Sequence, residues 1–106
     1  MDTNMAISYY KKAAEQGYTE ANMALGSLYE TKNFKESLPY YLAAAQDEYI
    51  PAMLKLGEIY TARQEYQLAY NWYEKAMRLL FPDTEDLTTV SPALEKLKKE
   101  INEQKN

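Results

Sequence analysis

The stretch KKAAEQGYTEANMALGSLY, residues 11–29, decides the fold, because much of it returns later in the chain. Shifting the sequence by 31 residues against itself aligns nine identical pairs between residues 9–29 and 40–60, among them Gly26 with Gly57. A shift of 32 residues extends the match into a third half-unit and aligns Tyr41 with Tyr73. Periods of about 20 to 50 residues are typical of solenoids, in which each unit buries its apolar face against its neighbours. The sequence therefore predicts stacked repeats.

The repeated units have the pattern of amphipathic helices. Apolar residues recur at helical spacing, as Leu38, Tyr41 and Leu42 do, and no Asn-Gly or Asp-Gly turn suggests a hairpin. Gly17 suits a helix end and Pro51 suits the first turn of a helix. The sequence predicts an all-α protein with helices over residues 5–16, 19–31, 34–47, 50–63, 66–80 and 92–104.

Two further helix starts carry a capping signal. Asn33, with Glu36 three residues later, is a variant of the capping box that predicts a helix beginning at Phe34. Ser91 followed by Pro92 predicts the start of the last helix, after the irregular segment FPDTEDLTTV.

Composition excludes several kinds of chemistry. The 106 residues contain neither cysteine nor histidine, which rules out disulfides, thiol nucleophiles, imidazole bases and zinc ligation by either side chain. The net charge of −4 disfavours nucleic acid as a partner. No stretch approaches the about 20 apolar residues of a membrane-spanning helix, and the N-terminus lacks a signal-peptide pattern. We expect a cytoplasmic protein without cofactor or metal, which neither binds nucleic acid nor inserts into a membrane.

The stretch Lys11–Tyr29 resembles the Sel-like repeat, a branch of the tetratricopeptide repeat superfamily. The resemblance is carried by Lys-Ala-Ala-Glu-Gln-Gly, by the alanine that follows, and by the Leu-Gly-x-x-Tyr core, which recurs from Leu56 to Tyr60. Two features depart from the family pattern: short connections, ETKNF and TARQEY, join the helices of a unit, and Glu48 replaces a helix-ending glycine.

The resemblance covers residues 5–81 and implies a right-handed α-α superhelix, a solenoid of tandem helix pairs. We expect one domain over residues 1–106, with a loop over 82–91 and a C-terminal capping helix over 92–104.

The resemblance also implies where a partner binds, because the first helix of each unit lines the concave face of such a superhelix. The implied partner-binding positions on this face or near its rim are Glu20, Met23, Ser27, Glu30, Leu54, Lys55, Glu58 and Thr61. For each of them, packing against a neighbouring helix is the alternative. Because Glu30 and Glu58 would face inward, we expect a protein or peptide partner with basic residues.

The first predicted helix has the pattern of a second-type helix without a first-type helix before it. Either the protein is trimmed, or something else covers this face. A second copy could do so in a homodimer, with Met5, Ile7 and Tyr9 or Tyr10 as the candidate contact residues.

Other conspicuous residues are interpreted as packing residues. Gly26 and Gly57 lie inside predicted helices, where a missing side chain allows a neighbouring helix to approach closely. Tyr41 and Tyr73 are expected to pack between helices with their hydroxyls near the rim. Trp72 takes a tyrosine position of the preceding unit and is expected to pack in the same way.

A protein-interaction module, acting as an adaptor or scaffold, is the function that the sequence favours. A small free-standing immunity protein that neutralises a bacterial toxin is an alternative, and so is a homodimerising repeat protein. An enzyme is not expected: Asp83, Glu85 and Asp86 form an acidic cluster in a loop, but no nucleophile, phosphate-binding glycines or metal-ligand spacing accompanies them.

Overall fold

The computed structural model describes residues 2–105, which form six α-helices and one short 3-10 helix, with no strand in that range. The helices are α1 (Thr3–Glu15), α2 (Thr19–Lys32), α3 (Phe34–Gln46), α4 (Ile50–Ala62), α5 (Tyr66–Leu80) and α6 (Pro92–Gln104), and the 3-10 helix is η1 (Leu87–Thr89). The all-α prediction is confirmed, and every α-helix begins and ends within two residues of its predicted bounds. Over the described part of the chain, no helix has the length and apolar character needed to cross a membrane.

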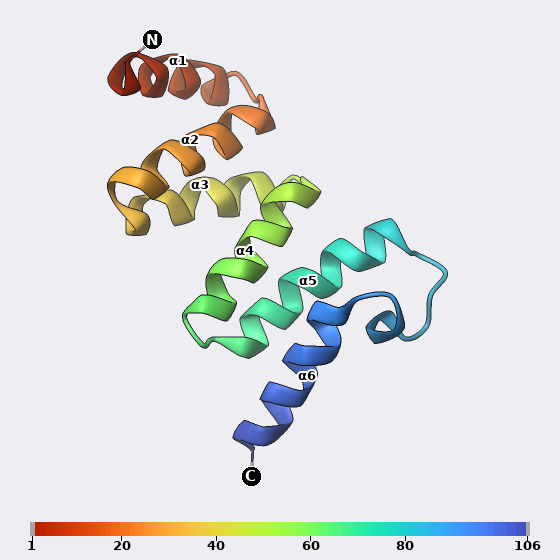
Figure 1. The fold of residues 1–106 in the computed structure, drawn as a ribbon. Coiled ribbons are helices and arrows are strands. Elements are labelled where there is room, and N and C mark those ends of the chain that lie inside the picture. Colours follow the sequence, from red (N-terminus) through yellow and green to blue (C-terminus); the bar gives the residue numbers. More distant parts are fainter. Residues whose placement is uncertain (1, 106) are drawn as a thin grey trace. The chain divides into compact units, whose positions relative to one another are not determined.

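Contacts divide the chain into two compact units, Met1–Ala52 and Met53–Asn106, with the boundary inside α4. In the first unit α2 packs on both α1 and α3, and Figure 1 shows these three helices following one another, coloured from red to yellow. In the second unit α5 packs on α6 and η1. Such packing of adjacent helices is that of a helical repeat. The expected single domain and the right-handed superhelix concern both units together and stay predictions.

The repeated positions of the sequence form the core of each unit. In the first unit, Leu25, Tyr41 and Ala44 have no exposed surface. In the second unit, the residues that correspond to Leu25 and Ala44 are Leu56 and Ala76, and they also have no exposed surface. Burying one large apolar side chain stabilises a fold by about 1.5 to 3 kcal/mol. The internal repeat is therefore, in the first place, a repeat of core contacts.

Gly26 and Gly57 allow close contact between helices, as the sequence predicts. A Cβ atom at Gly26 would lie 2.5 Å from Cε1 of Tyr41, and one at Gly57 would lie 2.6 Å from Cε2 of Tyr73. In both places a tyrosine ring of the second helix of a pair lies against the bare backbone of the first. No side chain fits at either glycine unless the ring moves.

The turns after α1 and α3 have the same geometry, although only one of them has glycine. Gly17 has φ +94° and Glu48 has φ +61°, so both residues have a left-handed backbone conformation. The two backbone hydrogen bonds of each turn also correspond. The amides of Gly17 and Glu48 donate to the carbonyls of Ala14 and Ala45 at 2.9 Å, and the amides of Tyr18 and Tyr49 donate to those of Ala13 and Ala44 at 3.2 Å. A Schellman-type helix end thus forms at the position where glycine is replaced by glutamate.

Both predicted N-cap side chains accept a hydrogen bond, but the Asn33 amide donates to the Tyr29 carbonyl at 2.6 Å, so the reciprocal bond of the expected capping box with Glu36 is not formed. The Asn33 Oδ1 atom accepts from the amide of Lys35 at 3.1 Å, and the Ser91 Oγ atom accepts from the amide of Leu94 at 3.2 Å. Each bond satisfies an amide that the first turn of a helix leaves without a helical partner.

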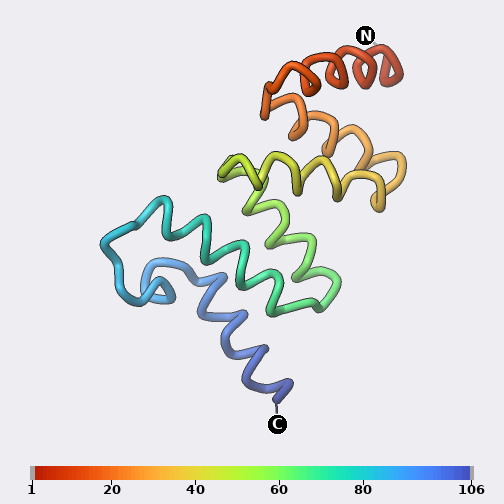
Figure 2. The backbone as a smooth tube through the Cα atoms, turned by 180° about the vertical axis from the view of Figure 1, so that it is seen from behind, coloured from red at the N-terminus to blue at the C-terminus, as the bar shows by residue number. Residues whose placement is uncertain are grey.

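The segment between α5 and α6 is more ordered than a plain loop. Figure 2 shows the chain leaving α5, turning through a wide bend and passing through η1 before α6. Leu87 anchors η1 with only 4% of its surface exposed. In α6, Leu94 and Leu97 are buried and Ile101 is half-buried, so these three residues form an apolar face of the helix.

Candidate functional site

The four implied partner-binding residues of the first unit lie along α2 and differ in exposure. Glu20 and Ser27 are exposed, while Met23 and Glu30 are half-buried. Their spacing of three, four and three residues places them on one face of the helix. α2 therefore offers this face to solvent only in part.

Glu30 and Ser27 are connected to the core through Tyr41. The Tyr41 ring is completely buried against Gly26, and its hydroxyl donates to Oε1 of Glu30 at 3.1 Å. The same hydroxyl contacts Oγ of Ser27 at 3.4 Å. Glu30 thus has a structural role, since its carboxylate satisfies a hydroxyl whose ring is buried.

In the second unit the implied partner-binding residues lie at corresponding positions of the helix, but the glutamate stands at a different one of these positions. Glu58 directly follows Gly57 and is exposed, and Thr61 takes the place that Glu30 has in the first unit. Thr61 Oγ1 donates to the Gly57 carbonyl at 2.7 Å. Leu54 and Lys55 are half-buried.

Glu58 acts on the tyrosine that packs at Gly57. Burial, and after it the negative charge of Glu58, raises the pKa of Tyr73 above its ordinary value. The Glu58 carboxylate therefore lies close enough to influence Tyr73, although it is itself exposed. In each unit a carboxylate of the first helix interacts with the tyrosine of the second: Glu30 with Tyr41, and Glu58 with Tyr73. The two glutamates do not occupy corresponding positions of the repeat.

A pocket of about 220 Å³ lies in the second unit, where α6 meets α4 and α5. This α4–α6 pocket is lined by Thr61, Tyr66, Tyr73, Ala93, Lys96, Leu97 and Glu100. Only Thr61 was among the implied site residues. The sequence carries no repeat signal for α6, so the α6 residues of this pocket had no counterpart from which to be inferred.

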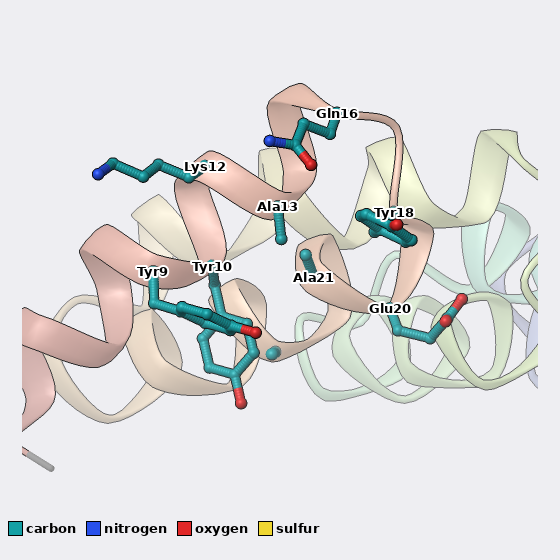
Figure 3. A pocket seen from close by; sticks show the side chains of 9 residues that line it. Tyr9, Tyr10, Lys12, Ala13, Gln16, Tyr18, Glu20 and Ala21 are labelled. Atoms are coloured by element: carbon teal, nitrogen blue, oxygen red, sulfur yellow. The ribbon is translucent and has the colours of Figure 1, made fainter.

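A larger pocket of about 720 Å³ lies in the first unit between α1 and α2. Figure 3 shows Tyr9 and Tyr10 on its α1 side and Glu20 on its α2 side. This α1–α2 pocket is lined by Tyr9, Tyr10, Lys12, Ala13, Gln16, Tyr18, Glu20, Ala21 and Ala24.

The candidate dimer face on α1 is only partly exposed. Met5 is 62% and Tyr9 63% exposed, and Tyr10 is half-buried. Ile7 is only 8% exposed, so the prediction that it is available for contact with a second copy is wrong. The reason is that α1 packs on α2, which buries an apolar side chain of α1 within the unit.

Aromatic residues also connect the three helices of the first unit. The rings of Tyr29 and Tyr40 are stacked, with centroids 5.3 Å apart and planes 1° from parallel. Lys11 of α1 lies over the Tyr29 ring, with Nζ 5.8 Å from its centroid. A hydrogen bond with Tyr29, together with charge interactions, raises the pKa of Lys11, and burial raises the pKa of Tyr40. These tyrosines pack between helices.

Trp72 is only half-buried, so the packing expected for it is incomplete. Lys75 lies over its ring, with Nζ 5.2 Å from the centroid.

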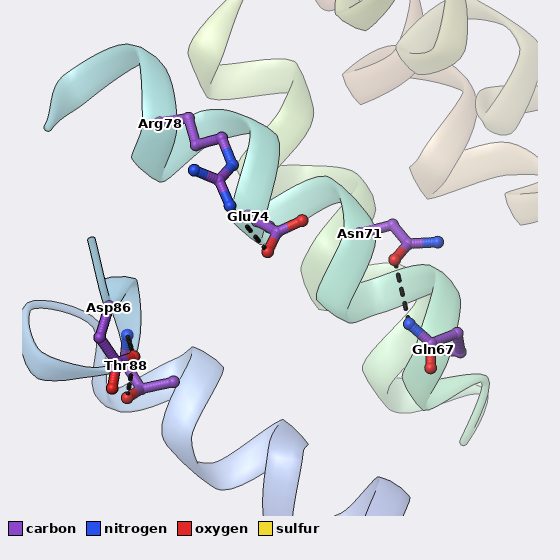
Figure 4. A network of polar contacts seen from close by, with 6 residues as sticks. All are labelled: Gln67, Asn71, Glu74, Arg78, Asp86 and Thr88. Atoms are coloured by element: carbon purple, nitrogen blue, oxygen red, sulfur yellow. Dashed lines mark hydrogen bonds and ion pairs between the residues drawn. The ribbon is translucent and has the colours of Figure 1, made fainter. Parts of the chain in front are cut away.

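Other polar groups of α5 pair along the helix: Gln67 donates to Asn71 at 3.0 Å, and Arg78 forms an ion pair with Glu74 at 3.4 Å (Figure 4). Such exposed pairs contribute at most about 0.5 kcal/mol each.

In the acidic loop between α5 and α6, the Asp86 carboxylate holds the start of η1 through hydrogen bonds to Thr88. The Asp86 Oδ1 atom accepts from the amide and the hydroxyl of Thr88, at 3.1 Å and 2.6 Å (Figure 4). These hydrogen bonds lower the pKa of Asp86. Asp83 and Glu85 are exposed. Within residues 2–105 no group of three or more acidic side chains could hold a metal ion.

The helix pair α4 and α5 decides the comparison with known families. Residues 52–87 match the family model of the tetratricopeptide repeat. The match begins in the first turn of α4, spans α5 and ends at the start of η1, so it covers one helix pair and the segment that follows. It supports a repeat of the tetratricopeptide type in this chain, and such repeats are typically non-catalytic interaction modules. No curated protein matches the chain.

Proposed function

We propose that the chain is a protein-interaction module of the Sel-like kind, which binds a partner segment through the first helices of its two helix pairs, α2 and α4. The match of α4 and α5 to the tetratricopeptide repeat carries this proposal. The contact residues would be the eight implied positions from Glu20 to Thr61.

Charge supports a partner with lysine or arginine. Glu20 and Glu58 are exposed on the proposed contact helices, and the whole chain has a net charge of −4. A basic partner would be attracted by this field, and its association rate would fall as salt screens it. Leu54, which is half-buried and lies four residues before Glu58 in the sequence, would supply apolar contact.

The test is affinity capture from native cell extract with three baits compared side by side. The intact chain should retain a stoichiometric partner, and the double variant Leu54→Ala with Glu58→Lys should lose it while its helical circular dichroism stays native. Glu85→Lys is the matched control, because it makes the same charge change at an exposed loop residue. A partner retained equally by the double variant would place the binding surface outside α4 and contradict the proposal.

A further inference from the structure

The α1 residues that line the α1–α2 pocket correspond by the internal repeat to α3 residues that contact α2. Shifting α1 by 31 residues superimposes it on α3, and α3 holds α2 through three specific contacts. The corresponding positions are Tyr9 and Tyr10 in α1 and Gln16 directly after it, and all three line the pocket (Figure 3).

The first correspondence is Tyr10 with Tyr41. Tyr41 is completely buried because its ring lies on the bare backbone of Gly26, and its hydroxyl donates to Glu30. Tyr10 carries the same ring at the same position of α1 but is only half-buried. None of the three glycines has Tyr10 among its nearest neighbours, so the close contact that Gly26 gives Tyr41 has no counterpart at Tyr10.

The second correspondence is Tyr9 with Tyr40. Tyr40 stacks on Tyr29 of α2, at a centroid distance of 5.3 Å, and is half-buried. Tyr9 is 63% exposed, and its ring makes an edge contact with the neighbouring ring of Tyr10. A second aromatic ring would cover Tyr9 as Tyr29 covers Tyr40.

The third correspondence is Gln16 with Asp47. The Oδ2 atom of Asp47 accepts from the hydroxyl of Thr19 at 3.0 Å, which joins the start of α2 to the end of α3. Gln16 is exposed at the matching place after α1, and its side-chain oxygen could accept in the same way. The three α3 residues that contact α2 thus have three counterparts, Tyr9, Tyr10 and Gln16, that line one pocket and remain at least partly exposed.

We propose that the α1–α2 pocket is a docking site for an amphipathic helix of a partner that has the chemistry of α2. Such a helix would carry a glycine or alanine under Tyr10, an aromatic residue three positions later for Tyr9, and a carboxylate four positions later for the Tyr10 hydroxyl. A hydroxyl residue seven positions before the small residue would reach Gln16. This pattern is the one that Thr19, Gly26, Tyr29 and Glu30 have in α2.

A second copy of this chain does not fit that description. Its glycines at Gly26 and Gly57 already lie under Tyr41 and Tyr73, and Gly17, the third glycine, lies in a turn. No alanine of the chain has an aromatic residue three positions later together with a carboxylate four positions later. A copy could supply the helix only by opening one of its own core contacts. The inference concerns a partner's helix bound at α1, and of the residues that line the pocket only Glu20 is also a proposed contact residue of α2 and α4.

The first test adds the helix as a peptide to the full chain. The probe is the acetylated and amidated peptide TEANMALGSLYETK, the sequence of residues 19–32, and the matched control is the same peptide with its central Gly→Leu. Proton–nitrogen NMR spectra should show shifts at Tyr9, Tyr10 and Gln16 that saturate with the probe and are absent with the control. The Tyr10→Ala chain should lose the response.

The second test removes the entropic cost of binding a short peptide, which is marginally helical alone. Asp2 caps α1 as Asn33 caps α3, so residues 19–32 can be joined directly before Asp2 with the same one-residue connection. The extended chain should melt several degrees above the parent, and the same extension with Gly→Leu should lose most of that gain. A comparable gain from both extensions, or shifts centred on α3 in the first test, would overturn the proposal.

Discussion

The ring of Tyr41 lies on the backbone of Gly26 so closely that a Cβ atom on the glycine would come within 2.5 Å of Cε1. Tyr73 and Gly57 repeat this relationship in the second unit. The contact explains how a tetratricopeptide-type pair tolerates glycine inside a helix, where it costs about 1 kcal/mol relative to alanine. The close approach of the ring offsets that cost.

Gly26→Ala should destabilise the chain even though alanine is the better helix former. The gain in helix propensity is about 1 kcal/mol, whereas forcing the buried Tyr41 ring aside costs about 1 to 3 kcal/mol. We expect a net loss of about 1 kcal/mol in the free energy of unfolding, measured by urea denaturation. In a Tyr41→Leu background the same substitution should be neutral or stabilising. A stabilised Gly26→Ala chain with Tyr41 intact would show that the ring is not in contact.

Glu48→Gly should stabilise the chain. Glu48 has φ +61°, a conformation that costs a residue with a Cβ about 1 to 2 kcal/mol, while Gly17 adopts the equivalent turn without that cost. Part of the gain is lost to the greater freedom of glycine in the unfolded chain, so we expect about 0.5 to 1 kcal/mol.

The measurement is the midpoint of urea unfolding for Glu48→Gly, with Glu48→Ala as the control for removing the carboxylate. Glu48→Ala should not stabilise, because it retains the Cβ atom. Gln64, also at φ +61°, offers an independent site for the same comparison. Equal effects of glycine and alanine at residue 48 would assign the change to the charge and not to the backbone.

The sequence was sufficient to predict the helices and their pairing in each unit, because both are local or repeated properties. Helix ends follow from Gly17, Asn33 and Ser91, and the close contact at Gly26 follows from a glycine inside a helical pattern. Glu48 could be marked only as a departure from the pattern, since nothing in one residue type shows that it will adopt a positive φ.

The sequence was not sufficient to predict what covers each helix face. Ile7 was assigned to an open face, but α1 packs on α2 and Ile7 is buried. An apolar pattern indicates that a face is covered without identifying the covering element. The role of Glu30 was also missed, because its bond to Tyr41 joins residues of two helices, and a hydroxyl at the rim of a core leaves no periodic signal.

Tyr41→Phe should destabilise the chain by about 1 to 2 kcal/mol while leaving its helical content unchanged. The substitution keeps the buried ring and removes only the hydroxyl that donates to Glu30 at 3.1 Å. Bonds to charged acceptors are worth more than neutral ones, but Glu30 is half-buried, which reduces the effect. Tyr18→Phe, at a residue that is 60% exposed, is the matched control and should change the unfolding free energy by less than about 0.5 kcal/mol.

The raised pKa of Tyr73 makes the stability of the chain depend on pH in the alkaline range. Burial, and then the charge of Glu58, disfavours the phenolate in the folded state, so the pKa of Tyr73 in the folded chain lies above the ordinary tyrosine value of about 10. The folded chain therefore holds the Tyr73 proton more tightly than the unfolded chain does. By linkage, this contribution to stability is fully present below about pH 10 and is lost as the pH rises through the folded pKa.

Glu58→Gln should bring the pKa of Tyr73 closer to the ordinary value without restoring it fully, because burial is the larger cause. Carbon-13 NMR of labelled tyrosine can follow each ring separately, with the Tyr73→Phe chain used to assign the signal. Glu103→Gln removes the same charge at an exposed residue of α6 and should leave the titration of Tyr73 unchanged. If both glutamine variants shifted it equally, the effect would come from the net charge of the chain, and the specific influence of Glu58 on Tyr73 would be disproved.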